Sequence, residues 1–193
     1  MENTQYANNA TENFQRIQLE SNAVKLDNNI VNSENNWAFI DMQNVYKEVQ
    51  KNGWKIQWKL FRKYLERECK VAKAVVFMGY IKENKGFYNF LERAGFTMEL
   101  RKVYRLKDGR IEGGNIDADL TSYVMDHKND YHKAIIIGDD GDYQRMVKSL
   151  TRQNKLEKII SSHSIKRTSH LLKEIAQKSI ISIESLKHII EYK

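Results

Sequence analysis

The chain of 193 residues contains no proline and only one cysteine, Cys69. Without proline, glycine, asparagine and aspartate must supply the turns. A single cysteine excludes an internal disulfide and suits a reducing, cytoplasmic setting. No apolar run approaches about 18 residues, so we expect no transmembrane helix. The N-terminus also lacks a basic segment followed by an apolar run, so we expect no secretory signal.

Charge is distributed unevenly along the chain. Residues 1–36 hold two bases and five acids, a net charge of −3, whereas residues 37–193 hold 30 bases and 20 acids, a net charge of +10. A basic body attracts phosphates, although a modest positive charge also aids solubility, and charge alone does not separate the two readings. The first 36 residues contain ten asparagines and few apolar residues. They predict a disordered tail, 1–36, ahead of one folded domain, 37–193.

Within 37–193, short apolar runs alternate with segments of helical periodicity. Strands are predicted at 37–41, 72–80, 96–104, 134–138, 156–162 and 181–183. Helices are predicted at 43–50, 56–69, 86–95, 117–127, 142–152, 166–178 and 184–191. This alternation is typical of a three-layer α/β domain with a parallel sheet and helices on both faces. The third strand alternates in hydrophobicity and is expected near an edge of the sheet.

The most informative segment is AIIIGDDGDY, residues 134–143. A buried strand ends in Asp139, Asp140 and Asp142, and ligands of open α/β sheets bind just outside the carboxyl ends of strands. Two carboxylates about 5 Å apart repel by roughly 3 kcal/mol at an effective dielectric constant of about 20. Such a cluster must therefore bind a metal, hold a proton or destabilise the fold.

Further acids occupy similar places, at strand ends or helix starts. Asp41 ends the first strand and is followed by Asn44, whereas Asp117 and Asp119 open a helix. Each alone is better explained as a helix cap or a first-turn charge. If the first and fourth strands are neighbours, however, Asp41 faces Asp140 across the sheet edge. Oxygen ligands suit Mg²⁺ or Mn²⁺, and no Cys/His pair has the spacing of a zinc site.

Three motifs resemble those of the NYN domain family, in particular its LabA-like branch, which is related to PIN-type nucleases. They are FIDMQNVY at 39–46, EGGNIDADL at 112–120 and GDDGDY at 138–143, and the resemblance spans about residues 37–192. It implies a three-layer PIN-like (Rossmann-like) parallel sheet with strand order 3-2-1-4-5. It also implies a metal-dependent ribonuclease that hydrolyses RNA phosphodiester bonds with a metal-activated water, leaving a 5′-phosphate.

The resemblance also assigns site residues by position. The acidic metal positions of the family fall on Asp41, Asp117, Asp140 and Asp142, and its motif asparagine falls on Asn44. Asp119 matches an acid found in part of the family. Three positions depart from the motifs: Met42 replaces a glycine and is expected to crowd the mouth of the site, Gly138 replaces a serine, and Asp139 adds an acid.

A basic segment precedes the second motif and could hold single-stranded RNA by charge and stacking, or be a solvated hairpin-like loop. Its candidate RNA-binding residues are Arg101, Lys102, Tyr104, Arg105, Lys107, Arg110 and Asn115. Trp54 is a weaker stacking candidate, and Trp58 is expected in the core. The five histidines are scattered and expected to be mostly superficial.

The alternative to a ribonuclease is an RNA-binding protein of the same fold that is weakly active or inactive. A phosphatase of the haloacid dehalogenase type would need a second aspartate where Gln43 stands, and a phospho-receiver domain would need an acceptor aspartate on a middle strand, which FMGY (77–80) does not offer. RNA is therefore the expected partner, a membrane is not, and a homo-oligomer is left open.

Overall fold

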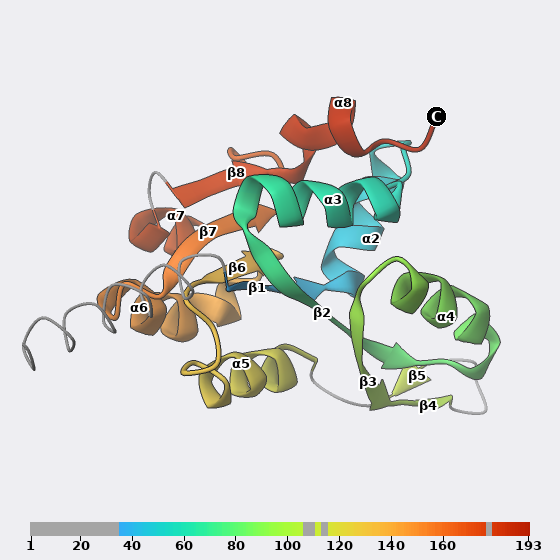
Figure 1. Ribbon diagram of the computed structural model, residues 1–193, viewed down its shortest axis with the longest axis horizontal. Coiled ribbons are helices and arrows are strands. Elements are labelled where there is room, and N and C mark those ends of the chain that lie inside the picture. Colours follow the sequence, from blue (N-terminus) through green and yellow to red (C-terminus); the bar gives the residue numbers. More distant parts are fainter. Residues whose placement is uncertain (1–34, 106–110, 113–115, 177–178) are drawn as a thin grey trace, which may run out of the picture. The chain divides into compact units, whose positions relative to one another are not determined.

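The computed structural model describes residues 35–193 except 106–110, 113–115 and 177–178 (Figure 1). The main sheet is parallel throughout and has the order β3-β2-β1-β6-β7-β8. Its strands are β1 (Asn36–Asp41), β2 (Val71–Tyr80), β3 (Thr97–Lys102), β6 (Ala134–Ile137), β7 (Leu156–Ser161) and β8 (Ile180–Ser182). The predicted tail lies almost wholly outside the described residues, so its disorder stays a prediction.

Helices cover both faces of this sheet, which confirms the predicted three-layer α/β architecture (Figure 1). One face carries α2 (Met42–Lys51), α3 (Trp58–Cys69), α4 (Lys85–Arg93) and α8 (Lys187–Ile190). The other carries α5 (Ile116–Asp126), α6 (Gln144–Arg152) and α7 (His170–Ala176). No helix among the described residues is long and apolar enough to cross a membrane.

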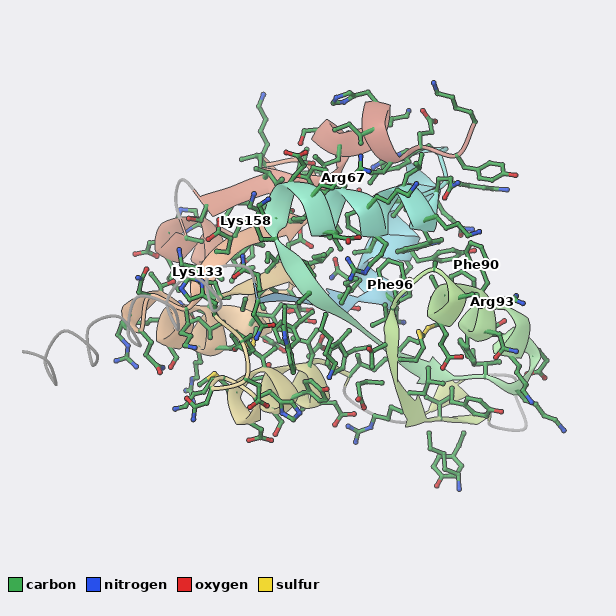
Figure 2. All side chains as sticks on the ribbon, viewed as in Figure 1. Arg67, Phe90, Arg93, Phe96, Lys133 and Lys158 are labelled. Carbon is green, nitrogen blue, oxygen red and sulfur yellow. The ribbon has the colours of Figure 1, made fainter. Side chains whose placement is uncertain are left out.

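Alternating side chains of the central strands explain why both faces are covered. In β1, Ala38 and Ile40 enter the cluster beneath α2 and α3, whereas Phe39 enters the cluster beneath α5 and α6. All four residues of β6 are fully buried. Phe96 is buried in the first cluster and Phe90 packs against it (Figure 2). The central strands have continuous apolar sequences because neither of their faces is exposed to water.

One edge strand and two C-terminal helices differ from the sequence-based expectation. The third strand ends at Lys102, and Tyr104–Arg105 forms a separate strand, β4, antiparallel to β5 (Ile111–Glu112). The helix predicted at 166–178 is shorter, since α7 begins at His170. The helix predicted at 184–191 is split into a 3-10 turn, η4 (Ile183–Leu186), and α8. The implied order 3-2-1-4-5 is confirmed and is extended by a sixth strand, β8.

The position of the site follows from the two central strands. β1 and β6 are parallel neighbours, with Ile40 opposite Ile137, so their carboxyl ends lie at the same edge. The chain leaves β1 through α2 on one face and leaves β6 through α6 on the other. Strands that diverge in this way open a crevice between them, which is where ligands bind in open α/β sheets.

Candidate active site

Asp41 is placed by the direct passage from β1 into α2. It is the N-cap of α2, with extended backbone angles, and its Oδ1 accepts a hydrogen bond of 3.0 Å from the backbone N–H of Asn44. Only 4% of the residue is exposed. Burial raises the pKa of Asp41, against the N–H of Asn44, which stabilises the charged form. A proton or a cation beside it therefore stabilises the acid in this setting.

Tyr143 joins Asp41 to an acid from a different segment. It lies in the 3-10 turn η2 (Gly141–Tyr143) after β6, and its hydroxyl is 2.9 Å from Asp41 Oδ2 and 2.7 Å from Asp117 Oδ1. The two carboxylate oxygens are therefore no farther apart than the sum of these distances. A phenol has one hydrogen and can donate to only one of them. The other oxygen must bring its own proton or face a lone pair, so the arrangement favours an added positive charge.

Asp41, Asp117 and Asp140 line one pocket of about 410 Å³. Asp140 is the N-cap of η2, and its Oδ1 accepts from the backbone N–H of Asp142 at 3.0 Å. Sequence reasoning did not single out Lys47 on α2, which lines the same pocket. We call this cavity the acidic pocket; its other lining residues are Gln43, Asn44 and Ile116.

The donors of the acidic pocket are carboxylate and amide oxygens, which suit a hard cation such as Mg²⁺ or Mn²⁺. Asp41, Asp117 and Asp140 would hold it. Within the described part of the chain, no three His, Cys, Asp or Glu side chains are gathered as a preformed metal site. Mg²⁺ does not need one, because it keeps several of its waters and binds one or two carboxylates directly.

Two other predicted acids lie outside this lining. Asp142 is exposed on η2 next to Asp140. Asp119 forms an ion pair with Arg101 of β3 and lines a smaller pocket with Tyr123. The structure therefore brings Asp41, Asp117 and Asp140 together. It places Asp119 in the neighbouring smaller pocket, where the Arg101 guanidinium already pairs with it.

Asp139 does not line the acidic pocket and is buried, with 6% exposed. It accepts hydrogen bonds of 2.6 Å from the hydroxyls of Ser161 and Ser162, and lies 2.8 Å from His163 Nδ1. The Ser162 hydroxyl also lies against the side-chain oxygen of Asn44, and its single hydrogen can serve only one of these two oxygens. Asp139, the additional acid of the third motif, thus binds the end of β7 and, through Ser162, is linked to the predicted catalytic residue Asn44.

His163 belongs to this network with 28% of its side chain exposed, whereas the histidines are expected to be mostly superficial. Its Nε2 lies 3.2 Å from Oε2 of Glu48, which is buried on α2 and also pairs with Arg167 at 2.6 Å. No spacing in the sequence relates these side chains, because they come from three elements. Trp54 is likewise buried and donates to Glu184 at 3.0 Å, so it is not a stacking platform.

The predicted RNA-binding residues are only partly described. Arg101 is engaged by Asp119. The Lys102 ammonium lies 5.2 Å from the centre of the Tyr104 ring, and 58% of Tyr104 is exposed, so the two form a surface patch suited to stacking. The remaining candidates, namely Lys107, Arg110, Asn115 and the side chain of Arg105, lie outside the described residues.

The two motif substitutions have structural reasons. Met42 is buried, with 2% exposed, and lines the neighbouring pocket, so it does not crowd the acidic pocket as expected. Gly138 has φ +144°, and a Cβ built there would lie 3.2 Å from Asp41 Cβ and 3.5 Å from the Tyr143 ring. Glycine at this position lets Asp41 and Tyr143 approach each other.

The sequence model of the NYN domain matches residues 37–184. The chain belongs to the NYN domain family. NYN domains are generally nucleases of the PIN-like type, and such domains typically use divalent metals. A protein of unknown function from Vibrio parahaemolyticus RIMD 2210633 has a similar structure, with a TM-score of 0.62 and 21% identity over 79% of this chain and 94% of that chain. At this identity the likeness shows the fold alone. No curated protein matches the chain.

Proposed function

We propose that this NYN protein is a metal-dependent ribonuclease that hydrolyses phosphodiester bonds of single-stranded RNA. The observation that carries the proposal is the meeting of Asp41, Asp117 and Asp140, from three distant segments, in one pocket at the diverging ends of β1 and β6. Carboxylates concentrated in this way are costly unless a cation is bound. A bound Mg²⁺ or Mn²⁺ supplies an activated water and stabilises the developing charge on the phosphate.

The chain's own residues supply binding and orientation. The side-chain amide of Asn44 lies against the Ser162 hydroxyl and lines the acidic pocket, where we propose that its N–H donates to a phosphate oxygen. Lys47 lines the acidic pocket and places a positive charge beside the substrate phosphate. Tyr143 holds Asp41 and Asp117 at a fixed spacing. Asp142 adjoins Asp140 and is proposed as a further metal-binding acid, in line with its motif position.

Cleavage of labelled single-stranded RNA tests the proposal. We expect cleavage with Mg²⁺ or Mn²⁺, none in EDTA, and a loss of at least about 100-fold in Asp140→Asn. The matched control is Asp126→Asn, which changes an exposed acid on α5 outside the acidic pocket and should cleave as the wild type does. RNA loss that is equal in all samples, or that EDTA does not affect, would contradict the proposal.

An RNA-binding protein without turnover is the second candidate. It is favoured by Tyr143, whose hydroxyl already engages Asp41 and Asp117. In that case RNA would bind through the basic surface and survive in every metal tested. Assignment to the LabA-like branch rests on the three motifs, and a cytoplasmic location rests on Cys69 as a single, buried thiol; both are proposals.

A further inference from the structure

A second cavity adjoins the acidic pocket and shares three residues with it. It has a volume of about 560 Å³, and Gln43, Lys47 and Ile116 line both cavities. We call it the apolar pocket, because the rest of its wall is mostly apolar. Sites for small organic ligands usually have volumes of about 300–1,000 Å³ and are lined by apolar groups with a few polar ones. The apolar pocket is therefore large enough for a nucleobase.

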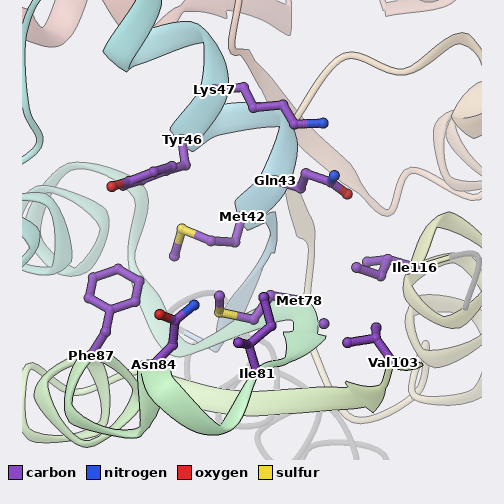
Figure 3. A pocket seen from close by; sticks show the side chains of 11 residues that line it. Met42, Gln43, Tyr46, Lys47, Met78, Ile81, Asn84, Phe87, Val103 and Ile116 are labelled. Carbon is purple, nitrogen blue, oxygen red and sulfur yellow. The ribbon is translucent and has the colours of Figure 1, made fainter. Parts of the chain in front are cut away.

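The walls of the apolar pocket suit a flat aromatic ligand. Figure 3 shows the thioethers of Met42 and Met78 near its middle, with Tyr46 and Phe87 toward one end. The Tyr46 and Phe87 rings are 6.4 Å apart and inclined at 54°. Methionine sulfur and aromatic rings make favourable contacts with aromatic ligands. Gly79 completes the wall; a Cβ there would lie 2.8 Å from Val103, so the glycine lets β2 and the end of β3 close together.

Polar groups are few and lie around these walls. The amides of Gln43 on α2 and Asn84 in η1 (Lys82–Asn84) line the pocket, and Asn84 makes no side-chain capping bond to α4 (Figure 3). Each amide offers a donor and an acceptor, which is what hydrogen bonding to the edge of a base requires. Lys47 lies at the boundary of the two pockets, where it would contact a phosphate.

We propose that the apolar pocket binds one unpaired nucleobase of the RNA whose phosphodiester lies in the acidic pocket. The inference rests on the proposed function for its substrate class. The shared wall of Gln43, Lys47 and Ile116 places a base and the adjoining phosphate of one nucleotide in neighbouring cavities. A paired base stacked in a duplex does not enter such a pocket, so the arrangement selects single strands.

Binding without cleavage tests this inference. The full chain is titrated in EDTA against fluorescent single-stranded RNA octamers and against an octamer of the same backbone without bases, and anisotropy is recorded. Base stacking on one aromatic ring contributes about fivefold or more in affinity. We expect the abasic octamer to bind at least about fivefold more weakly, and Phe87→Leu to remove most of this difference, because leucine keeps apolar volume but not the flat ring.

The matched control is Phe90→Leu. Phe90 lies on the same helix, α4 (Figure 2). It stacks on Phe87 with centroids 6.5 Å apart and does not line the apolar pocket. It should bind RNA as the wild type does. Asn84→Ala should narrow the difference in affinity among octamers of A, C, G and U, because it removes a group that reads the base edge.

The inference is wrong if abasic and normal octamers bind equally, if neither binds, or if Phe87→Leu and Phe90→Leu have equal effects. Its failure is distinguishable from that of the proposed function. RNA that binds through Phe87 but is not cut in any metal refutes the ribonuclease and keeps the base pocket. If RNA is cut in a metal-dependent way but binds Phe87→Leu as tightly as the wild type, the base pocket is refuted and the ribonuclease is kept.

Discussion

Tyr143→Phe tests the arrangement of the acidic pocket, because it removes one oxygen and keeps the ring. That oxygen lies 2.9 Å from Asp41 Oδ2 and 2.7 Å from Asp117 Oδ1, and Tyr143 has no exposed surface. Burial raises the pKa of Tyr143, so its hydroxyl remains a donor at every working pH. In the variant the two carboxylates face each other with no donor between them.

The magnitude follows from the charge of the acceptors. A hydrogen bond to a charged group contributes about 1.5–3 kcal/mol. We expect Tyr143→Phe to lower the free energy of unfolding of the metal-free protein by that amount at pH 7. A bound cation compensates both carboxylates, so saturating Mn²⁺ should reduce the loss to below about 1 kcal/mol.

Urea unfolding in EDTA and in saturating Mn²⁺ measures both values. The control is Tyr131→Phe, since Tyr131 is also buried, with 2% exposed, and its hydroxyl donates to the carbonyl of Val124 at 2.9 Å. Both groups of this hydrogen bond are uncharged, so its loss should lower the free energy of unfolding by about 0.5–1.5 kcal/mol in both buffers. A Tyr143→Phe loss that is the same in both buffers would refute the reasoning.

Three further predictions concern the same pocket. Gly138→Ser should lower the free energy of unfolding by about 1–3 kcal/mol in thermal denaturation, because φ is +144° and the new Cβ would lie 3.2 Å from Asp41. Asp119→Asn should change the single-turnover cleavage rate less than about tenfold, because Asp119 pairs with Arg101, whereas Asp117→Asn should lower it at least about 100-fold. The third concerns pH: burial raises the pKa of Asp41 above 3.8, so the folded state holds this proton more tightly than the unfolded state. The stability that this contributes is present below about pH 3.8 and is lost as pH rises through the folded-state pKa. Urea denaturation across pH should show this decline in the free energy of unfolding of the metal-free wild type, and Asp41→Asn should not show it.

The central fold could be predicted from the sequence because its strands are apolar on both faces. β1, β2 and β6 lie within one residue of their predicted bounds, since a fully buried strand gives an unambiguous apolar run. The edges could not be predicted equally well. Tyr104–Arg105 continues the alternating pattern of β3, and only its pairing with Ile111–Glu112, which is a tertiary contact, separates it from that strand.

The site shows the same division. The meeting of Asp41 and Asp140 follows from parallel neighbours whose carboxyl ends share one edge. Nothing in the sequence showed that the Tyr143 hydroxyl would join Asp41 to Asp117. The pairing of Asp119 with Arg101 depends on the position of β3 beside α5, and the network around His163 joins elements whose spacing in the sequence carries no pattern.

Binding of Mn²⁺ tests the central claim most directly. Crystals of the full chain grown or soaked in Mn²⁺ would show the ion by its anomalous scattering. We expect a peak in the acidic pocket, in contact with carboxylate oxygens of at least two of Asp41, Asp117 and Asp140. A pocket without a peak at saturating Mn²⁺, with manganese bound at other sites only, would contradict it.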